Sequence, residues 1–182
     1  MDETPCPTDP NDIVFAAAAF AAKAHRHQLR KDQETPYVSH VFRVCLVVRQ
    51  VFGFDDPRML AAALLHDTIE DTTTDRDDLI ERFGDEVAGW VVALTKDTRL
   101  PDREREDAYC RGLAAACWQV QVCKLADIFD NLGDCKQFGP AGRRRTAARS
   151  RMYLDALRPG LPPEAEAAYR VVDARLREFE AS

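Results

Sequence analysis

The chain has 182 residues, of which 46% are hydrophobic and 31% are charged, and its formal net charge is −6. This composition fits one globular domain with a sizeable core and excludes an intrinsically disordered chain. No apolar run is long enough to span a membrane, and the negative charge argues against nucleic acid as the main partner.

Two further features point to the cytoplasm. Asp2 and Glu3 stand where a signal peptide would carry positive charge. The six cysteines form no Cys-x-x-Cys pair, which is typical of reduced thiols in a cytosolic protein. We therefore expect a cytoplasmic protein that is not secreted and has no membrane partner.

The hydrophobic pattern predicts helices and no strands, because it shows no sustained period-two alternation and no Asn-Gly or Asp-Gly hairpin. Residues 1–10 contain three prolines and are expected to form a flexible tail, which leaves residues 11–182 as a single domain. Helices are expected over residues 11–28, 37–51, 57–71, 75–83, 85–97, 101–117 with an interruption at Gly112, 120–132, a segment that carries Arg143 to Arg151, and 164–179.

Several polar residues along these first helices have ordinary structural interpretations. His25 and His27 lie near the end of the first helix, where histidines more often interact with the helix dipole than bind metal. Arg30 and Lys31 follow on a polar loop, and from their spacing alone they are interpreted as ordinary surface charges. His40 lies in the first turn of the second helix, where a lone histidine is more often a packed core residue.

The most informative stretch is Ala61–Asp71, in which five apolar residues lead directly into His66, Asp67, Glu70 and Asp71. Burying one unpaired carboxylate costs several kcal/mol, so three within five residues need a cation, a solvated cleft or both. His66 and Asp67 can share one metal only where the helix bends or ends, or where the metal sits over the edge between them. The alternative is a helix C-terminus with solvated acids.

A second informative stretch is residues 120–132, where apolar residues recur at three- and four-residue spacing. Asp127 is flanked by apolar residues, and a buried aspartate needs a partner. Asn131 lies one turn further along the same face. Together with His40 and the pair His66-Asp67, this aspartate completes a spaced series of ligand candidates.

Two imidazoles and two carboxylates suit a divalent metal such as Mn²⁺, Fe²⁺ or Zn²⁺. A metal of this kind polarises a phosphoryl oxygen and lowers the pKa of bound water. Glu70 and Asp71, just past two of the ligand candidates, are placed to position or deprotonate that water.

The series His…His-Asp…Asp resembles the ligand pattern of the HD-domain metal-dependent phosphohydrolases. Residues 62–72, Ala-Ala-Leu-Leu-His-Asp-Thr-Ile-Glu-Asp-Thr, are similar to the signature of the hydrolase domain of RelA/SpoT proteins. Other motifs in that family's order are Arg30-Lys31, Pro36-Tyr37, His40, Phe83-Gly84, Val87, Thr95-Lys96, Lys124-Leu125-Ala126-Asp127 and Asn131-Leu132. A chain of this length leaves no room for the family's synthetase domain, so it resembles the stand-alone small alarmone hydrolases.

The resemblance implies an all-α HD-domain fold and hydrolysis of the 3′-pyrophosphate of ppGpp or pppGpp to GDP or GTP plus pyrophosphate. It implies a small nucleotide as the partner and Mn²⁺ as the cofactor, with another divalent metal as the alternative. The implied metal ligands are His40, His66, Asp67 and Asp127.

The resemblance also assigns roles around the metal. Glu70 and Asp71 would act on the attacking water. Arg30 would pack on the guanine base, which suits a planar guanidinium. Lys31 would lie near the substrate, and Asn131 would hydrogen-bond near the ribose or phosphates.

The chain departs from the family at three positions. Val41 stands where the family usually has proline, with little effect expected on ligation. His27 replaces a glycine, and Ile128 replaces a basic residue. If that basic residue supports the substrate's phosphates, affinity or specificity has changed.

Two alternatives to an alarmone hydrolase stay open. Ile128 and His27 motivate the same site acting on another nucleotide or phosphate ester, such as an adenosine alarmone or a phosphorylated cofactor. The second alternative is a non-catalytic module that binds the alarmone. The intact pair Glu70-Asp71 argues against it, because a sensor has no need to activate water.

Overall fold

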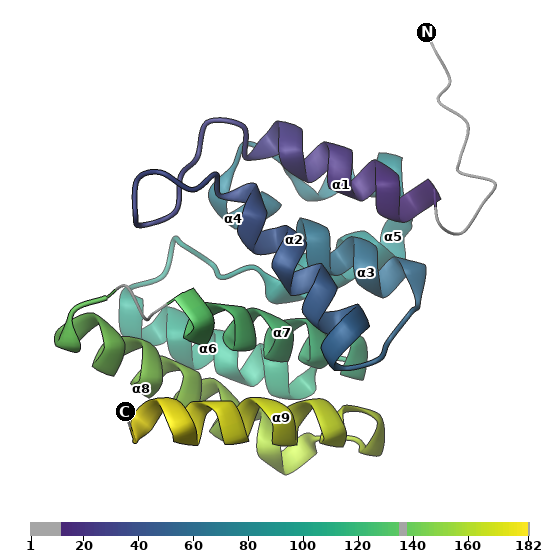
Figure 1. Ribbon diagram of the computed structural model, residues 1–182. Helices are drawn as coiled ribbons and strands as arrows, with labels where there is room; N and C mark the ends of the chain where they lie inside the picture. Colours follow the sequence, from purple (N-terminus) through teal and green to yellow (C-terminus); the bar gives the residue numbers. More distant parts are fainter. Residues whose placement is uncertain (1–11, 135–137, 182) are drawn as a thin grey trace, which may run out of the picture.

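The computed structural model describes residues 12–134 and 138–181. Within these ranges the regular elements are helices, and β-type pairing is limited to an isolated antiparallel bridge between Leu29 and Pro36, which confirms the predicted all-α fold (Figure 1). The elements are α1 (Asp12–Ala24), α2 (Val38–Leu46), the π-helix η1 (Val47–Val51), α3 (Pro57–Leu65), α4 (Thr68–Asp71), α5 (Arg76–Leu94), α6 (Asp102–Ala115), α7 (Trp118–Asp134), α8 (Pro140–Leu157), the 3₁₀-helix η3 (Arg158–Gly160) and α9 (Pro163–Glu180).

Helix α3 is the central element of the N-terminal half, and α1, α2, α5 and α7 all pack against it. Its start is fixed by the Asp56 side chain, which accepts a hydrogen bond from the backbone N–H of Arg58, and by Pro57 in the first turn. Every residue from Met59 to Leu65 is buried, and three consecutive alanines allow neighbouring helices to approach closely. The end of α3 is therefore held inside the core.

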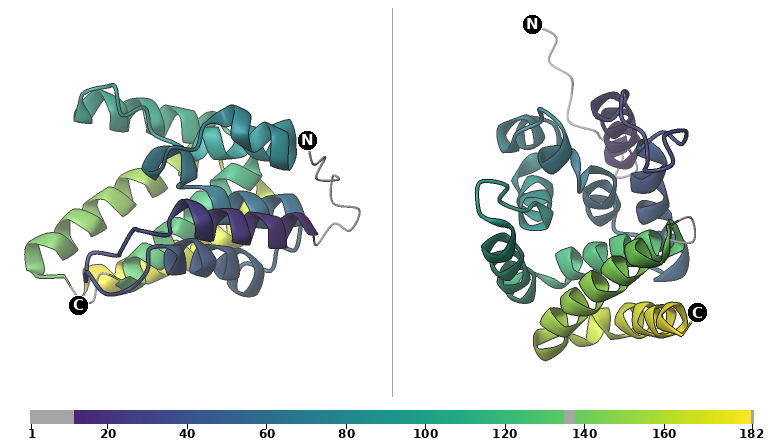
Figure 2. Two further views of the ribbon diagram at one scale, coloured as in Figure 1. Left: turned by 90° about the horizontal axis from the view of Figure 1, so that it is seen from above. Right: turned by 90° about the vertical axis from the view of Figure 1, so that its left-hand side faces the viewer.

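Helix α7 connects the two halves of the molecule. It packs against α2, α3 and α5 and also against α8 and α9. Figure 2 shows that α9 lies on the opposite side of α7 from α1. The apolar face of α7 includes Val122, Leu125 and Ala126, all fully buried. This packing brings polar residues of α7 close to the start of α2 and to the end of α3.

Four predicted boundaries need correction. The helix expected over residues 57–71 is divided into α3 and α4. The first helix ends at Ala24 instead of residue 28, because residues 25–27 form a turn in which the Nδ1 atom of His25 lies 2.7 Å from the side-chain oxygen of Gln28. The predicted helices on either side of Gly84 form one element, α5, with a kink at this residue, whose φ is +83°. Gly112 does not interrupt α6, since Tyr109 and Leu113 on either side of it are buried and hold the helix in place.

Most of the buried apolar side chains form one cluster that extends from Ala17 to Leu176. In the described part of the chain, four cysteines are free thiols, as the sequence predicts. The tail expected over residues 1–10 lies outside the described residues. Among the helices of the described ranges, none is both long and apolar enough to cross a membrane.

Candidate metal centre and active site

The backbone breaks between α3 and α4, and His66 and Asp67 lie at this break. The α3 helix ends at Leu65, and Asp67 has φ −100° and ψ −1° before α4 begins at Thr68. The change of direction turns both side chains the same way, so that Nε2 of His66 lies 3.0 Å from Oδ2 of Asp67. Sharing one metal requires the helix to bend or end at these two residues, and α3 does end there.

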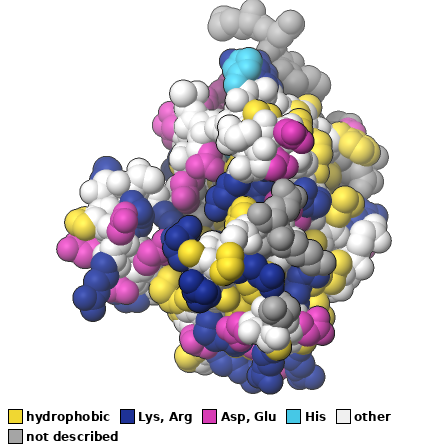
Figure 3. All heavy atoms as spheres, turned by 60° about the vertical axis from the view of Figure 1, so that its left-hand side comes forward, with side chains coloured by type: hydrophobic (Ala, Val, Ile, Leu, Met, Phe, Trp, Pro, Cys, Tyr) yellow, Lys and Arg dark blue, Asp and Glu magenta, His cyan; other side chains and the backbone are white. Residues whose placement is uncertain are grey.

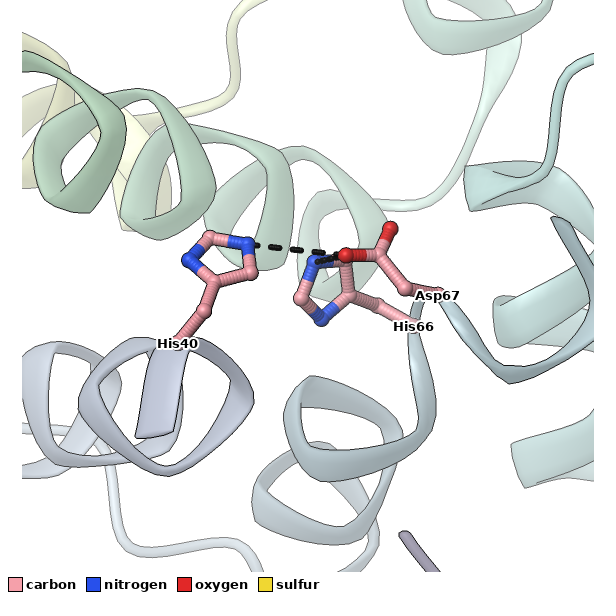
Figure 4. Close-up of side chains that lie close together, drawn as sticks. All are labelled: His40, His66 and Asp67. Atoms are coloured by element: carbon pink, nitrogen blue, oxygen red, sulfur yellow. Dashed lines mark ion pairs between the residues drawn. The ribbon is translucent and has the colours of Figure 1, made fainter. Parts of the chain in front are cut away.

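Two other helices bring the remaining ligand candidates to this break. Nε2 of His40, on α2, lies 3.5 Å from Oδ2 of Asp67 and 3.2 Å from Oδ1 of Asp127, on α7. The nearest ligand atoms of His40, His66 and Asp67 all lie within 4.8 Å of one another (Figure 4). Asp127 borders this group, with Oδ1 3.9 Å from Nε2 of His66. The fold thus brings together all four residues that the sequence predicts as ligands.

The histidines present the atoms that a metal requires. Nδ1 of His66 lies 2.9 Å from the carbonyl oxygen of Ala63, so this nitrogen carries a proton and Nε2 is the atom left for a metal. Nε2 of His66 is buried without a hydrogen-bond partner. A buried nitrogen of this kind, aimed at two carboxylates, fits a divalent cation.

The electrostatics keep the carboxylates ionised. Burial alone raises the pKa of Asp127, but the Lys124 ammonium and the hydrogen bond with His40 hold that pKa far below its ordinary value. Burial alone lowers the pKa of His40, but hydrogen bonds with Asp127 and Asp130 hold it well above its ordinary value. Ionised carboxylates are the form that binds a cation.

Two residues without an assigned role, Tyr37 and Lys124, and the predicted substrate-binding residue Asn131 hold these carboxylates in place. The Tyr37 hydroxyl donates to Oδ2 of Asp67 at 2.6 Å. The Lys124 ammonium donates to Oδ2 of Asp127 at 2.7 Å, and the Asn131 amide donates to its Oδ1 at 2.5 Å. The spacing of Lys124, three residues before Asp127 on an apolar helix, is the signal that predicts such a pair.

Lys124 also belongs to a second cluster, which no sequence pattern predicts. Its ammonium lies 4.5 Å from the ring centre of Tyr153 and 5.2 Å from that of Tyr109. The Lys96 ammonium lies over the same two rings and 3.2 Å from a carboxylate oxygen of Glu106. Lys96 lies in the segment after α5, and the other residues come from α6, α7 and α8, so only the tertiary structure brings them together.

Glu70 and Asp71 lie on α4, beside the metal-ligand candidates. Oε2 of Glu70 accepts a hydrogen bond from the backbone N–H of Lys96 at 3.0 Å. Burial raises the pKa of Glu70 and, together with the charge of Asp67, raises the pKa of Asp71. A carboxylate with a raised pKa is better suited to accept a proton from water, but the roles of both residues stay predictions.

Arg30 is a partly buried residue with defined partners, not ordinary surface charge. Its side chain is 15% exposed and donates to Oδ2 of Asp134 at 2.7 and 3.0 Å and to the side-chain oxygen of Asn131 at 3.2 Å. The Lys31 ammonium lies 4.8 Å from the ring centre of Phe138.

Arg30 and Lys31 line a cavity of about 100 Å³ together with Asp32, Thr35, Arg43, Asp134 and Phe138. Figure 3 shows Lys and Arg side chains gathered around the middle and along the lower part of one face of the molecule. A larger cavity, of about 380 Å³, lies between α8 and α9, but its lining includes none of the site residues predicted from sequence. Its arginines are paired with acids, as in Arg151–Asp173 and Arg158–Glu166. The smaller cavity is therefore the one lined by Arg30 and Lys31, which the sequence predicts as substrate-binding residues.

Comparison with known proteins agrees with this geometry. The HD-domain family matches the chain over residues 17–154. The guanosine-3′,5′-bis(diphosphate) 3′-pyrophosphohydrolase MESH1 of Xenopus tropicalis is 38% identical over 131 residues, which cover 71% of this chain and 73% of the relative. The Homo sapiens protein of the same name is 40% identical over 130 residues, with the same coverage of both chains.

A bacterial relative and a solved structure show the same likeness. The guanosine-3′,5′-bis(diphosphate) 3′-pyrophosphohydrolase of Aquifex aeolicus is 35% identical over 137 residues, which cover 74% of this chain and 19% of that protein. A solved structure described as a metazoan ortholog of SpoT that hydrolyses ppGpp superposes with a TM-score of 0.81 at 31% identity. The superposition covers 94% of this chain and 98% of the other.

Proposed function

Because this chain belongs to the HD-domain family and is related there to the small SpoT-type hydrolases, we propose that it removes pyrophosphate from the 3′ position of ppGpp or pppGpp. The products would be GDP or GTP and pyrophosphate. The observation that carries the proposal is the convergence of His40, His66, Asp67 and Asp127 at the break after α3.

We propose that these four residues hold a divalent cation and that this cation is Mn²⁺. Two imidazole nitrogens and two carboxylates are a donor set that Mn²⁺ accepts, as do Fe²⁺ and Zn²⁺. When bound, such a cation stabilises negative charge on a phosphoryl oxygen and lowers the pKa of a nearby water. The hydroxyl of Tyr37 keeps the Asp67 carboxylate oriented toward the centre.

Glu70 is the residue we propose to handle the attacking water, with Asp71 in a supporting role. The hydrogen bond from the Lys96 backbone uses Oε2 of Glu70, so Oε1 is the atom that would take the proton. The raised pKa of Glu70 makes the carboxylate a stronger base than an exposed glutamate. Anchoring by the backbone also limits its motion, which favours catalysis by a positioned base.

Arg30, Lys31 and Asn131 are the residues we propose to bind the nucleotide. Asp134 and Asn131 hold the Arg30 guanidinium, and the ring centre of Tyr37 lies 5.3 Å from its carbon. A guanidinium held in this way is preorganised for stacking on a planar base. The small cavity beside it provides room for part of the nucleoside.

The proposal is tested by incubating the purified protein with ppGpp, once with Mn²⁺ and once with a chelator. We expect metal-dependent release of GDP and pyrophosphate in equal amounts. Intact ppGpp in the presence of protein with measured bound Mn²⁺ would refute the substrate assignment. Release of phosphate from the 5′ side would refute the assignment of the bond.

One observation favours a second candidate, the same chemistry on another phosphate ester. Ile128, which stands where the family has a basic residue, is only 2% exposed and packs in the core, so this position supplies no charge to a phosphate. A panel of ppGpp, pppGpp, adenosine alarmones and phosphorylated cofactors at equal concentration separates the two candidates. Tight ppGpp binding with metal present but without turnover would instead support a binding module.

A further inference from the structure

A buried carboxylate on α7 lies directly behind His40, on the side of the ring that faces away from the metal centre. Oδ2 of Asp130 is 2.7 Å from Nδ1 of His40, and the Asp130 side chain is only 6% exposed. The other nitrogen of the same ring, Nε2, faces Asp67 and Asp127. Asp130 therefore contacts Nδ1, the ring nitrogen of His40 that a metal at this centre would not use.

In the neutral ring that a metal binds, this contact selects one tautomer of His40. If Nδ1 carries the proton, it donates to the Asp130 carboxylate and leaves the Nε2 lone pair aimed at the centre. In the opposite tautomer, the Nδ1 lone pair would face an ionised carboxylate at 2.7 Å, and Nε2 would offer a hydrogen where a cation needs a lone pair. A carboxylate in this position also makes the imidazole a stronger electron donor.

Arg43 fixes the carboxylate itself. Its Nε donates to Oδ1 of Asp130 at 2.6 Å and its Nη2 to Oδ2 at 2.9 Å, so two parallel hydrogen bonds prevent rotation of the group. The same Nη2 reaches both oxygens of Asp134 at 2.9 Å, and Asp134 also accepts from Arg30. A continuous chain of charged side chains thus runs from His40 to the small cavity.

The second histidine of the centre is held differently. Nδ1 of His66 faces the backbone carbonyl of Ala63, a neutral acceptor that no side-chain substitution removes. His40 instead depends on a side chain 90 residues away in the sequence. Its orientation is therefore open to a direct test by mutation.

We propose that Asp130 is a positioning residue that fixes the tautomer and orientation of His40 for metal binding, and that Arg43 clamps Asp130 in place. The proposal rests on the proposed function in one respect, that His40 is a metal ligand. It assigns no contact with the substrate to either residue.

The principal variant is Asp130→Asn, which keeps the size of the side chain but removes its charge and leaves one accepting oxygen where Asp130 uses both. The readout is the Kd for Mn²⁺, measured by calorimetry on protein stripped with a chelator, so no substrate is needed. We expect Mn²⁺ to bind 10- to 100-fold more weakly, the usual effect of losing the carboxylate partner of a metal-bound histidine. We expect kcat at saturating Mn²⁺ to fall while the KM for ppGpp changes less.

The matched control is Asp173→Asn on α9. Asp173 also pairs with two arginines, Arg151 and Arg177, but it is absent from the candidate centre. We expect this variant to keep the parental Kd for Mn²⁺. An equal loss in both variants would overturn the proposal, because it would show that any broken Asp–Arg pair weakens the centre.

A second readout reports the tautomer directly. With diamagnetic Zn²⁺ bound, the ¹⁵N chemical shifts of the His40 ring should show a protonated Nδ1 in the parent and a changed Nδ1 signal in Asp130→Asn, while His66 stays unchanged. A folded Asp130→Asn protein with the parental Kd and parental His40 shifts overturns the proposal. If this variant does not fold, Arg43→Gln is measured in the same way, and a parental Kd there overturns it.

The proposed function and the positioning role of Asp130 can be refuted independently of each other. If the parent binds Mn²⁺ but leaves ppGpp intact, the proposed function fails, while the change in Kd still tests Asp130. If the parent hydrolyses ppGpp and Asp130→Asn keeps the parental Kd, the proposed function stands and the role of Asp130 is rejected.

Discussion

Replacing Lys124 by Met is expected to destabilise the metal-free protein and to strengthen its response to Mn²⁺. The Lys124 ammonium is buried, lies 2.7 Å from Oδ2 of Asp127 and packs over the rings of Tyr109 and Tyr153. Methionine keeps the length of the side chain and its packing between the rings, so the change removes mainly the charge.

The expected loss of stability depends on the partners that Asp127 keeps after the substitution. Removing one member of a buried ion pair costs about 3–5 kcal/mol, because the other charge stays buried without its partner. Asp127 keeps the hydrogen bond from Asn131 and the contact with His40, so we expect the lower end, about 3 kcal/mol. For a domain of this size that corresponds to a fall in Tm of about 6–12 °C.

Mn²⁺ should recover part of this loss. A cation at the centre supplies the positive charge that Asp127 has lost, and the Lys124 ammonium no longer repels it. In the parent, Mn²⁺ at one hundred times its Kd adds about 2.7 kcal/mol of stability, and the gain in Lys124→Met should be larger.

The assay is thermal unfolding of the parent and Lys124→Met, each with chelator and with saturating Mn²⁺. Lys23→Met, the same substitution at an exposed position on α1, is the control and should change stability by less than about 0.5 kcal/mol. If Lys124→Met loses the same Tm with and without Mn²⁺, Lys124 acts through packing, and the electrostatic argument at Asp127 is wrong.

Three further substitutions, the last with a matched control, test the centre and the fold. His66→Ala should abolish both Mn²⁺ binding and ppGpp hydrolysis. Calorimetry measures the first and the ppGpp assay the second, and retention of either would contradict the prediction. Glu70→Gln should keep the Kd for Mn²⁺ but lower kcat by about 10²–10⁴, so undiminished turnover would remove Glu70 from the role of base. Gly84→Ala should lower the free energy of unfolding by about 1–3 kcal/mol, because a φ of +83° strains any residue with a Cβ atom. Gly89→Ala, in the same helix with open space around it, should be neutral or slightly stabilising in denaturant titrations, and an equal loss at both positions would contradict the backbone explanation.

Capping residues and prolines, which act over a few residues of sequence, determine most of the helix boundaries. Asp75 and Asp78 form the capping box that starts α5, and Pro57 starts α3, both readable within four residues of chain. Local rules fail where packing outweighs them. A glycine inside a helix costs about 1 kcal/mol, yet α6 continues through Gly112 because the buried side chains of Tyr109 and Leu113 contribute more than that.

The candidate ligands could also be found from sequence, because charged residues after a buried apolar run need a compensating partner. The partners themselves could not. Tyr37 reaches Asp67 across 30 residues, and Asp130 reaches His40 across 90. Sequence spacing fixes which face of its own helix a side chain occupies, but the packing of α2, α3 and α7 against one another decides which faces meet. The sequence therefore identifies the candidate metal ligands, and only the tertiary structure decides which side chains orient them.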